Sequence, residues 1–189
     1  MDNKTEQQLN LIMQIFELLN SKNIPIWLAG GWALDFLCNR KFVNHDDIDL
    51  FIRKSDYDKL EKLLIDNGFE IVNKKYHQTY FIKDSLYLDI IKFEDFKNFI
   101  SYVDLNGNKT FCLSENSFQL TNVYFHNSIK LLLISPLGQL ILTKLLNQIF
   151  PEMKLRNKDL RNISLLENMF NLKNINIDYD KYGLKYLTS

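Results

Sequence analysis

Two aspartates alternate with apolar residues near the start of a short β-type segment, and this pattern constrains the fold more than any other feature of the chain. Asp47 and Asp49 flank Ile48, and residues 50–52 continue the apolar run. On a strand, residues i and i+2 project from the same face, about 7 Å apart at the backbone. The apolar residues then enter a core while both carboxylates share the other face, where a divalent cation would relieve their repulsion.

The alternative interpretation of this segment is a solvated acidic turn formed by Asp46, Asp47 and Asp49. Against it, a strand with apolar neighbours has no structural reason to place two acids on one face. A third acid, Asp89, lies among apolar residues on another predicted strand, 87–91, where an unpaired charge is costly. If the two strands are neighbours, the three carboxylates form a cluster that can bind metal and accept a proton from an attacking hydroxyl. Otherwise Asp89 is a salt-bridged edge residue.

A glycine pair follows the first predicted strand. Residues 26–29 form a short apolar run closed by Gly30 and Gly31, which predicts a buried strand, a tight turn and a short helix over 32–38. Glycines let the backbone pass close to another group, and the N–H groups that open the next helix favour an anion such as a phosphate. The same pair is also compatible with a tight strand-to-helix connection and nothing more.

Hydrophobic periodicity predicts a mixture of helices and strands in the rest of the chain. Further helices are predicted over 4–21, from Ser55 as N-cap to Asn67-Gly68, and over 137–150 and 158–170. Further strands are predicted over 69–72, 79–82, 120–125 and 129–133, with hairpin turns at Asn106-Gly107 and His126-Asn127. Pro151 separates the last two helices, so the C-terminal third should be a helical hairpin.

Composition supports a soluble chain with a sizeable core. The 189 residues are 46% apolar and 24% charged, which excludes a disordered chain. Lys and Arg number 23 and Asp and Glu number 23, and this balance argues against a phosphate polymer as partner. The longest apolar run, 131–134, is far shorter than the roughly 20 residues that a bilayer requires, and the N-terminus lacks a secretory signal. With two cysteines in unrelated contexts, we expect a cytoplasmic protein.

The order of these motifs resembles that of a known family, the nucleotidyltransferase superfamily related to DNA polymerase β. The likeness is greatest to the small antibiotic nucleotidyltransferases that adenylylate aminoglycosides or lincosamides, and it extends over residues 25–92. It rests on Gly30-Gly31, Trp32, Asp35, the run His45-Asp46-Asp47-Ile48-Asp49-Leu50, and Leu88-Asp89.

The resemblance implies an α+β nucleotidyltransferase fold, with a mixed twisted sheet flanked by helices. We expect a catalytic domain over 1–135 and a C-terminal helical subdomain over 136–189. Three further residues of the motif are expected to be structural. Trp32 should be a packing anchor, Asp35 a helix-surface or loop-fixing residue, and His45 a hydrogen-bonding residue that orients the loop.

The resemblance also implies a role for each site residue. Asp47 and Asp49 would coordinate Mg²⁺ bound to a nucleoside triphosphate, either ATP or another, and Asp89 would complete the site and act as general base. Gly30 and Gly31 would flank the triphosphate. Two metal ions held by three carboxylates can bridge both sides of an in-line displacement. Other phosphate contacts are expected from basic residues of the loop and the C-terminal helices, namely Arg40, Lys41, Lys144 and Lys158.

The acceptor and the oligomeric state, monomer or homodimer, stay open. Residues 150–189 carry seven basic and five acidic residues, so this region lacks the acidity expected of an aminoglycoside pocket. A mixed pocket for a lincosamide-like or other small hydroxyl compound can be formed by Tyr76, Tyr80, Tyr87, Tyr102, Glu94, Asp95 and Asp104.

Three functions therefore compete. The first is transfer of AMP to a hydroxyl of a small molecule such as an antibiotic. The second is a nucleotidyltransferase of the toxin or phage-defence kind, which acts on tRNA or a protein with the same acids. The third is a non-catalytic nucleotide-binding module, and retention of all three acids argues against it.

Overall fold

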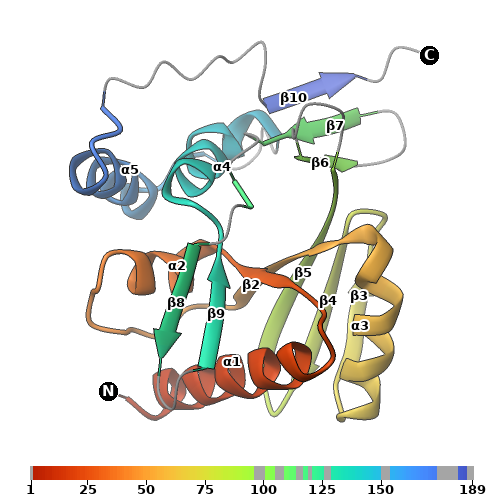
Figure 1. Ribbon diagram of the computed structural model, residues 1–189. Helices are drawn as coiled ribbons and strands as arrows, with labels where there is room; N and C mark the ends of the chain where they lie inside the picture. Colours follow the sequence, from red (N-terminus) through yellow and green to blue (C-terminus); the bar gives the residue numbers. More distant parts are fainter. Residues whose placement is uncertain are drawn as a thin grey trace.

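The computed structural model contains a mixed sheet flanked by helices, which confirms the predicted α+β class (Figure 1). It describes residues 2–95, 101–104, 109–113, 117–118, 121–125, 129–149, 154–173 and 183–186. The helices in these residues are α1 (Asn3–Ser21), α2 (Gly30–Leu37), α3 (Lys54–Asp66), α4 (Pro136–Ile149) and α5 (Asn157–Met169). The strands are β1 (Ile26–Leu28), β2 (Ile48–Arg53), β3 (Glu70–Lys74), β4 (Gln78–Lys83), β5 (Leu86–Asp95), β6 (Ser101–Asp104), β7 (Lys109–Cys112), β8 (Thr121–Phe125), β9 (Ile129–Leu133) and β10 (Gly183–Tyr186).

Four strands form the centre of the sheet in the order β5-β2-β1-β9. β2 runs parallel to β5 and antiparallel to β1, and β1 runs parallel to β9. On the other side of β5, β4 pairs antiparallel with it, and β3 pairs with β4. Because β1 and β2 are antiparallel, the end of β1 lies beside the start of β2, where Ala29 N donates to Asp49 O at 2.9 Å. The glycine pair and the aspartate motif therefore meet at one edge of the sheet.

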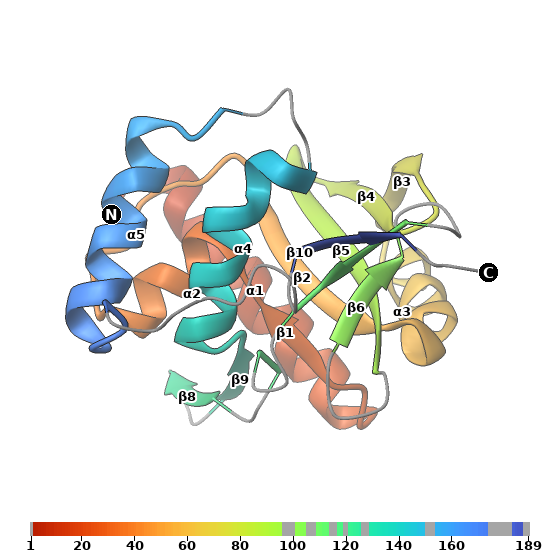
Figure 2. The same ribbon diagram turned by 90° about the horizontal axis from the view of Figure 1, so that it is seen from above.

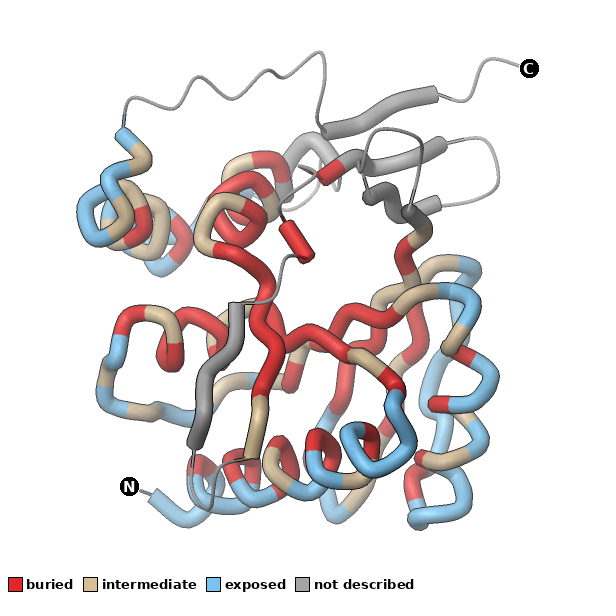
Figure 3. Tube along the Cα trace, viewed as in Figure 1, coloured by how far each residue is buried: buried red, intermediate tan, exposed pale blue. Residues whose placement is uncertain are grey.

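The core lies along these central strands. α1 contributes an apolar face of nearly inaccessible side chains, as its 3.6-residue periodicity predicts. Figure 3 shows the burial of β1, β2 and β5 and the exposure of β3 and of the outer side of α3. The core residues that hold the strands of the site include Leu28, Ile48, Leu50, Leu88 and Ile90.

A second group of elements lies beyond the ends of the central strands. β6 pairs with the end of β5 and with β7, and β10 pairs with β7. α4 follows β9 after two residues and lies between α5 and the strands β6, β7 and β10 (Figures 1 and 2). The predicted packing of the last two helices is confirmed, whereas the sequence analysis did not predict β10.

Most predicted elements agree closely with the structure, and three details differ for local reasons. Gly30 and Gly31 form the first turn of α2 rather than a turn before it. Asp47 immediately precedes β2. Ser55 lies inside α3, because Arg53 occupies the N-cap position. The two predicted hairpin turns fall outside the described residues, although the strands that flank each turn pair antiparallel.

Two expectations about the whole chain have different outcomes. In the part of the chain that the structure describes, no helix is long and apolar enough to span a membrane. The division into domains at residues 135 and 136 stays a prediction.

Candidate active site

Three carboxylates converge at the edge of the sheet where β2 begins. Asp49 on β2 lies directly opposite Asp89 in the parallel pair with β5, and Asp47 comes just before β2. One oxygen from each residue lies within 4.8 Å of the other two. The condition stated for an acid cluster, that the two acidic strands are neighbours, is therefore met. The cluster differs from a solvated turn, because Asp89 is only 5% exposed and the other two acids are half-buried.

Burial and mutual repulsion make full ionisation of this cluster costly. Desolvation raises the pKa of Asp49 well above its usual range, and the charges of Asp47 and Asp89 raise it further. Desolvation, followed by the charge of Asp46, also raises the pKa of Asp47. Burial raises the pKa of Asp89 to about 7, although a hydrogen bond from Gln78 opposes this shift. Titratable groups held in such unfavourable surroundings are typical of functional sites.

The donor set fits a divalent cation. Oxygen ligands in small number suit Mg²⁺, which completes its coordination with water and phosphate oxygens. Asp89 Oδ1 is buried and has no hydrogen-bond partner among the described residues. A buried oxygen without a partner is unfavourable unless a ligand contacts it. Asp47, Asp49 and Asp89 are therefore the residues that could hold Mg²⁺.

The glycine pair packs directly against the site. Gly30 has a φ angle of 62°, and a Cβ at this position would lie 1.8 Å from Asp49 Oδ2. A Cβ at Gly31 would lie 2.3 Å from His45 Nδ1. Any larger residue at either position would displace a side chain of the site. The glycines thus make room for Asp49 and His45, while their contact with a triphosphate stays a prediction.

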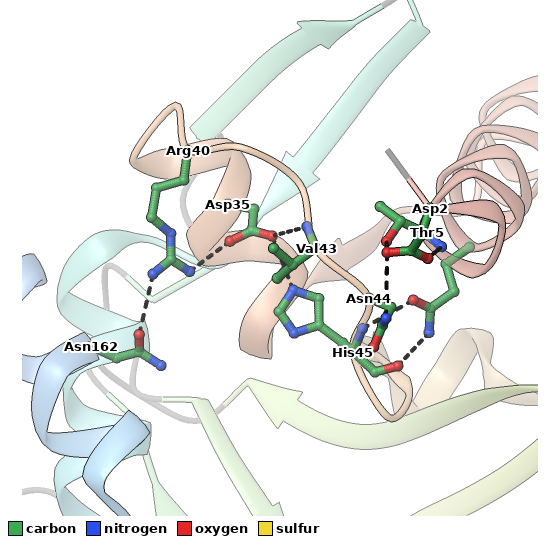
Figure 4. Close-up of polar contacts among 9 residues, drawn as sticks. Asp2, Thr5, Asp35, Arg40, Val43, Asn44, His45 and Asn162 are labelled. Carbon is green, nitrogen blue, oxygen red and sulfur yellow. Dashed lines mark hydrogen bonds and ion pairs between the residues drawn. The ribbon is translucent and has the colours of Figure 1, made fainter.

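A buried carboxylate fixes the loop that leads to the aspartate motif (Figure 4). Asp35 on α2 is 1% exposed, and its Oδ2 lies 3.0 Å from His45 Nε2. Its Oδ1 accepts a hydrogen bond from Arg40 Nη2 at 2.6 Å. Arg40 Nη1 reaches Asn162 Oδ1 on α5 at 3.4 Å. Asp35 therefore has the loop-fixing position that was one of its two predicted roles, and Arg40 is held in an ion pair with it.

The backbone of His45 is held from α1. Gln8 is fully buried, donates from Nε2 to His45 O at 2.7 Å, and accepts at Oε1 from His45 N at 3.1 Å. The His45 ring also lies edge-on to Trp32, with 5.4 Å between the ring centroids. Because His45 comes two residues before Asp47, these contacts direct the chain into the acid cluster. They agree with the expected orienting role of His45 and packing role of Trp32.

Two cations at the start of α5 act on the acids. Lys158 Nζ lies 3.9 Å from Asp46 Oδ2, and its charge works to lower the pKa of both Asp47 and Asp49. Arg156, which was not among the predicted site residues, acts on the pKa of Asp49 in the same sense. This end of α5 therefore supplies positive charge to the acid cluster.

The remaining predicted phosphate contacts are placed differently. Lys144 on α4 pairs with Glu167 on α5 at 2.6 Å and so ties the two helices together. Lys41 is exposed on the loop after α2. The structure thus brings Lys158 towards the acids and holds Arg40 and Lys144 in ion pairs. Contact of these residues with a nucleotide stays a prediction.

Among the residues expected to shape an acceptor pocket, Tyr76 and Glu94 both accept hydrogen bonds from Lys54, at 3.4 and 2.8 Å. Tyr80 on β4 lies opposite Asp89, and burial followed by the Asp89 charge raises the pKa of its hydroxyl to about 12. Tyr76 and Tyr87 are exposed. Glu94 pairs with Lys54 at 2.8 Å. For Tyr102, Asp95 and Asp104 the structure describes only the backbone, in β5 and β6.

A cavity of about 390 Å³ lies at the opposite end of β2 from Asp49. The guanidinium of Arg53 at its wall lies over the ring of Trp27, 5.0 Å from the centroid. The cavity is lined by Arg53, Lys54, Ser55, Phe93 and Glu94.

Three buried glutamines that contact the site were missed by the sequence analysis. Gln8 bonds to His45, Gln78 bonds to Asp89, and Gln139 on α4 accepts from Gly30 N at 3.1 Å. Each partner is distant in sequence or on another strand, so no local motif indicates these contacts. Only the burial of Gln8 could have been predicted from the sequence, because Gln8 lies four residues before Ile12 and therefore on the apolar face of α1.

The fold is that of the nucleotidyltransferases. The structure of ANT(2'')-Ia in complex with adenylyl-2''-tobramycin superposes with a TM-score of 0.69 and 17% identity, over 88% of this chain and 91% of that one. The lincosamide antibiotic adenylyltransferase LnuA bound to lincomycin superposes with a TM-score of 0.65 and 22% identity, over 89% and 99% of the two chains. At these identities, the likeness shows the fold alone.

The sequence comparison gives the family. The profile of aminoglycoside-2''-adenylyltransferase matches residues 11–127, and the chain belongs to this family. A 2''-aminoglycoside nucleotidyltransferase of Klebsiella pneumoniae is 46% identical over 43 residues, which are 23% of this chain and 24% of the relative. A lincosamide resistance protein of Staphylococcus haemolyticus is 33% identical over 70 residues, 37% of this chain and 42% of the relative. The chain therefore spans between about a quarter and two fifths of the length of these curated relatives.

The packing of Gly30 against Asp49 predicts that Gly30→Ala is more damaging than Gly68→Ala. Both glycines have positive φ angles, 62° and 84°, so both variants incur backbone strain. Only at Gly30 would the new Cβ overlap a side chain, since nothing lies within 4 Å of a Cβ at Gly68. In urea denaturation we expect Gly68→Ala to lower the free energy of unfolding by about 1 kcal/mol and Gly30→Ala by about 2–4 kcal/mol. Equal losses would contradict the close contact.

The raised carboxyl pKa values predict that the metal-free protein loses stability as pH rises. A carboxyl whose pKa is higher in the folded state binds more protons there than when unfolded. Its contribution is therefore favourable at low pH and is lost as pH rises from about 4 through the Asp89 value of about 7. In EDTA at pH 8 we expect Asp89→Asn to raise the melting temperature above that of the wild-type protein by about 3 °C or more. Between pH 5 and 8, the melting temperature of this variant should change less with pH than that of the wild type.

The matched control for this measurement is Asp66→Asn, which removes an exposed carboxylate at the end of α3. We expect this variant to keep the pH dependence of the wild-type protein. An unchanged or lower melting temperature of Asp89→Asn at pH 8 would show that the cluster is not electrostatically strained.

Proposed function

We propose that this protein is a Mg²⁺-dependent nucleotidyltransferase that moves AMP from ATP to a hydroxyl group of a small molecule such as an antibiotic. The observation that carries the proposal is the convergence of Asp47, Asp49 and Asp89 within 4.8 Å. Membership of the aminoglycoside-2''-adenylyltransferase family supports the reaction class. The names of the relatives, an aminoglycoside nucleotidyltransferase and a lincosamide resistance protein, support an antibiotic as acceptor. A cytoplasmic location, where ATP and Mg²⁺ are present, is part of the proposal.

In the proposed reaction, the acceptor oxygen bonds to the α-phosphorus of ATP as the bond from that phosphorus to pyrophosphate breaks. Bound Mg²⁺, with two ions expected, would offset the charge that develops on the phosphate oxygens and on pyrophosphate. Asp47, Asp49 and Asp89 would hold the metal. Asp89 would also accept the acceptor's hydroxyl proton, because its buried Oδ1 has no hydrogen-bond partner among the described residues.

The basic residues at the start of α5 would bind the triphosphate. Lys158 and Arg156 supply positive charge to the cluster from outside the sheet. Once metal neutralises the acids, Lys158 is available to phosphate oxygens, whereas Arg156 is also paired with Asp159 at 2.9 Å. Among the nucleotide contacts predicted from the sequence, Lys158 is the one that its position favours. Gly30 and Gly31 would keep the backbone close to the site, as their packing against Asp49 and His45 requires.

The direct test is incubation with α-labelled ATP, Mg²⁺ and separate acceptors: aminoglycosides, lincosamides, bulk tRNA and candidate proteins. We expect label on an aminoglycoside or a lincosamide, identified by chromatography and mass. Asp47→Asn and Asp49→Asn should each lower the rate by about 10³-fold or more, because each removes charge that holds the metal. The matched control is Asp66→Asn, which removes an exposed carboxylate on α3 and should react at the wild-type rate.

The other outcomes separate the remaining functions. Label on tRNA or on a protein, with none on the antibiotics, would replace the small-molecule acceptor by a macromolecular one. No label on any acceptor, from a protein that melts cooperatively, would favour a non-catalytic nucleotide-binding module. Full activity of the Asp47→Asn/Asp49→Asn double variant would overturn the metal assignment.

A further inference from the structure

A buried amide lies against the third acid. Gln78 on β4 is 8% exposed, and its Nε2 donates to Asp89 Oδ2 at 2.7 Å and to the Tyr80 hydroxyl at 2.8 Å. An ionised carboxylate can only accept hydrogen bonds, so the nitrogen of the amide must face Asp89. The two protons of this one nitrogen are therefore both used, and the orientation of the amide group is determined.

Strand register explains why these groups meet. Gln78 and Tyr80 are two residues apart on β4 and so share a face, and Tyr80 lies opposite Asp89 on β5. Asp89 in turn lies opposite Asp49 on β2. One row of polar side chains therefore crosses three neighbouring strands on a single face. The neighbours of Asp89 in sequence, Leu88 and Ile90, point to the other face and are fully buried.

The two oxygens of Asp89 have different surroundings. Oδ2 accepts the hydrogen bond from Gln78, whereas Oδ1 is buried and has no partner among the described residues. A partial rotation of the carboxylate about its last bond would move Oδ2 away from the amide and break the bond to Gln78. The amide therefore holds Oδ2, the Tyr80 hydroxyl on the same face also favours the charged form of Asp89, and Oδ1 is left for a ligand.

We propose that Gln78 is a positioning residue, which holds Asp89 so that Oδ1 alone is presented to the divalent cation and to the acceptor's proton. This inference rests on the proposed function. Residues that hydrogen-bond to a metal ligand orient it, and their loss commonly weakens metal binding by about 10- to 100-fold. A purely structural hydrogen bond would contribute to the stability of β4 and β5 and leave metal affinity unchanged.

The test uses Gln78→Met, which keeps the length of the side chain and removes both donors. The matched control is Gln14→Met, the same exchange at an exposed position on α1. The probe is Mn²⁺ alone, and its binding to the full chain without nucleotide is followed by electron paramagnetic resonance. We expect Gln78→Met to raise the Kd for Mn²⁺ by about tenfold, and Gln14→Met to leave it unchanged.

Transfer kinetics give a second readout. For Gln78→Met we expect kcat to fall by about tenfold or more, while KM for ATP changes by less than about threefold, because the interaction acts on the reacting groups. Gln78→Asn keeps an amide on a side chain that is one methylene shorter, and it replaces Gln78→Met if the Met variant does not fold. We expect it to show the same loss of Mn²⁺ affinity and of kcat. The melting temperature of each variant without metal shows whether the protein is folded.

The results separate this inference from the proposed function. A folded Gln78 variant with Mn²⁺ affinity and kcat within twofold of wild type overturns the positioning role. If Asp49→Asn abolishes Mn²⁺ binding in the same experiment, the metal site stands and only the role of Gln78 fails. If the wild-type protein itself binds no Mn²⁺, the metal site fails, and the inference about Gln78 fails with it.

Discussion

The parallel pairing of β2 with β5 is the interaction on which the rest of the site depends. It places Asp49 opposite Asp89 on one face, while Ile48, Leu50 and Leu88 are buried on the other. A shift of this pairing by one residue would turn the acids into the core and the apolar residues out of it. The core therefore specifies the register, and the register brings together two carboxylates despite their mutual repulsion.

Close packing around the cluster follows from this arrangement. The edge of the sheet at which Asp49 lies also receives the end of β1, so the next residue after Ala29 must be a glycine to leave room for the carboxylate. The same constraint applies one residue later, where Gly31 faces His45. Asp35 and Gln8 then fix His45 by its ring and its backbone. Contacts from α1, α2 and β2 thus fix the path of the backbone that leads into Asp47.

Sequence patterns predicted the parts of this site that are local. The spacing of Asp47 and Asp49, the glycine pair and the periodicity of α1 each depend on neighbouring residues. They agree with the structure, except that the glycines open α2 and that Asp47 lies just before β2. Sequence could not show that Lys144 pairs with Glu167, because this pair depends on how α4 packs on α5. The pairing of Arg40 with Asp35 depends on the path of the loop after α2, which no motif indicates. The roles of Gln78 and Gln139 were missed for the same reason, since their partners lie across the sheet or on another element. β10 was missed because its partner, β7, is far away in sequence.

The central claim is that the three acids form one divalent-cation site. The most direct measurement is a crystal structure with Mn²⁺ and a non-hydrolysable ATP analogue, in which anomalous scattering locates the metal. The account predicts an anomalous peak within coordination distance of Asp47, Asp49 and the Oδ1 atom of Asp89, with phosphate oxygens completing the shell. An ordered nucleotide whose metal contacts none of these carboxylates, or no anomalous peak at the cluster, would contradict it.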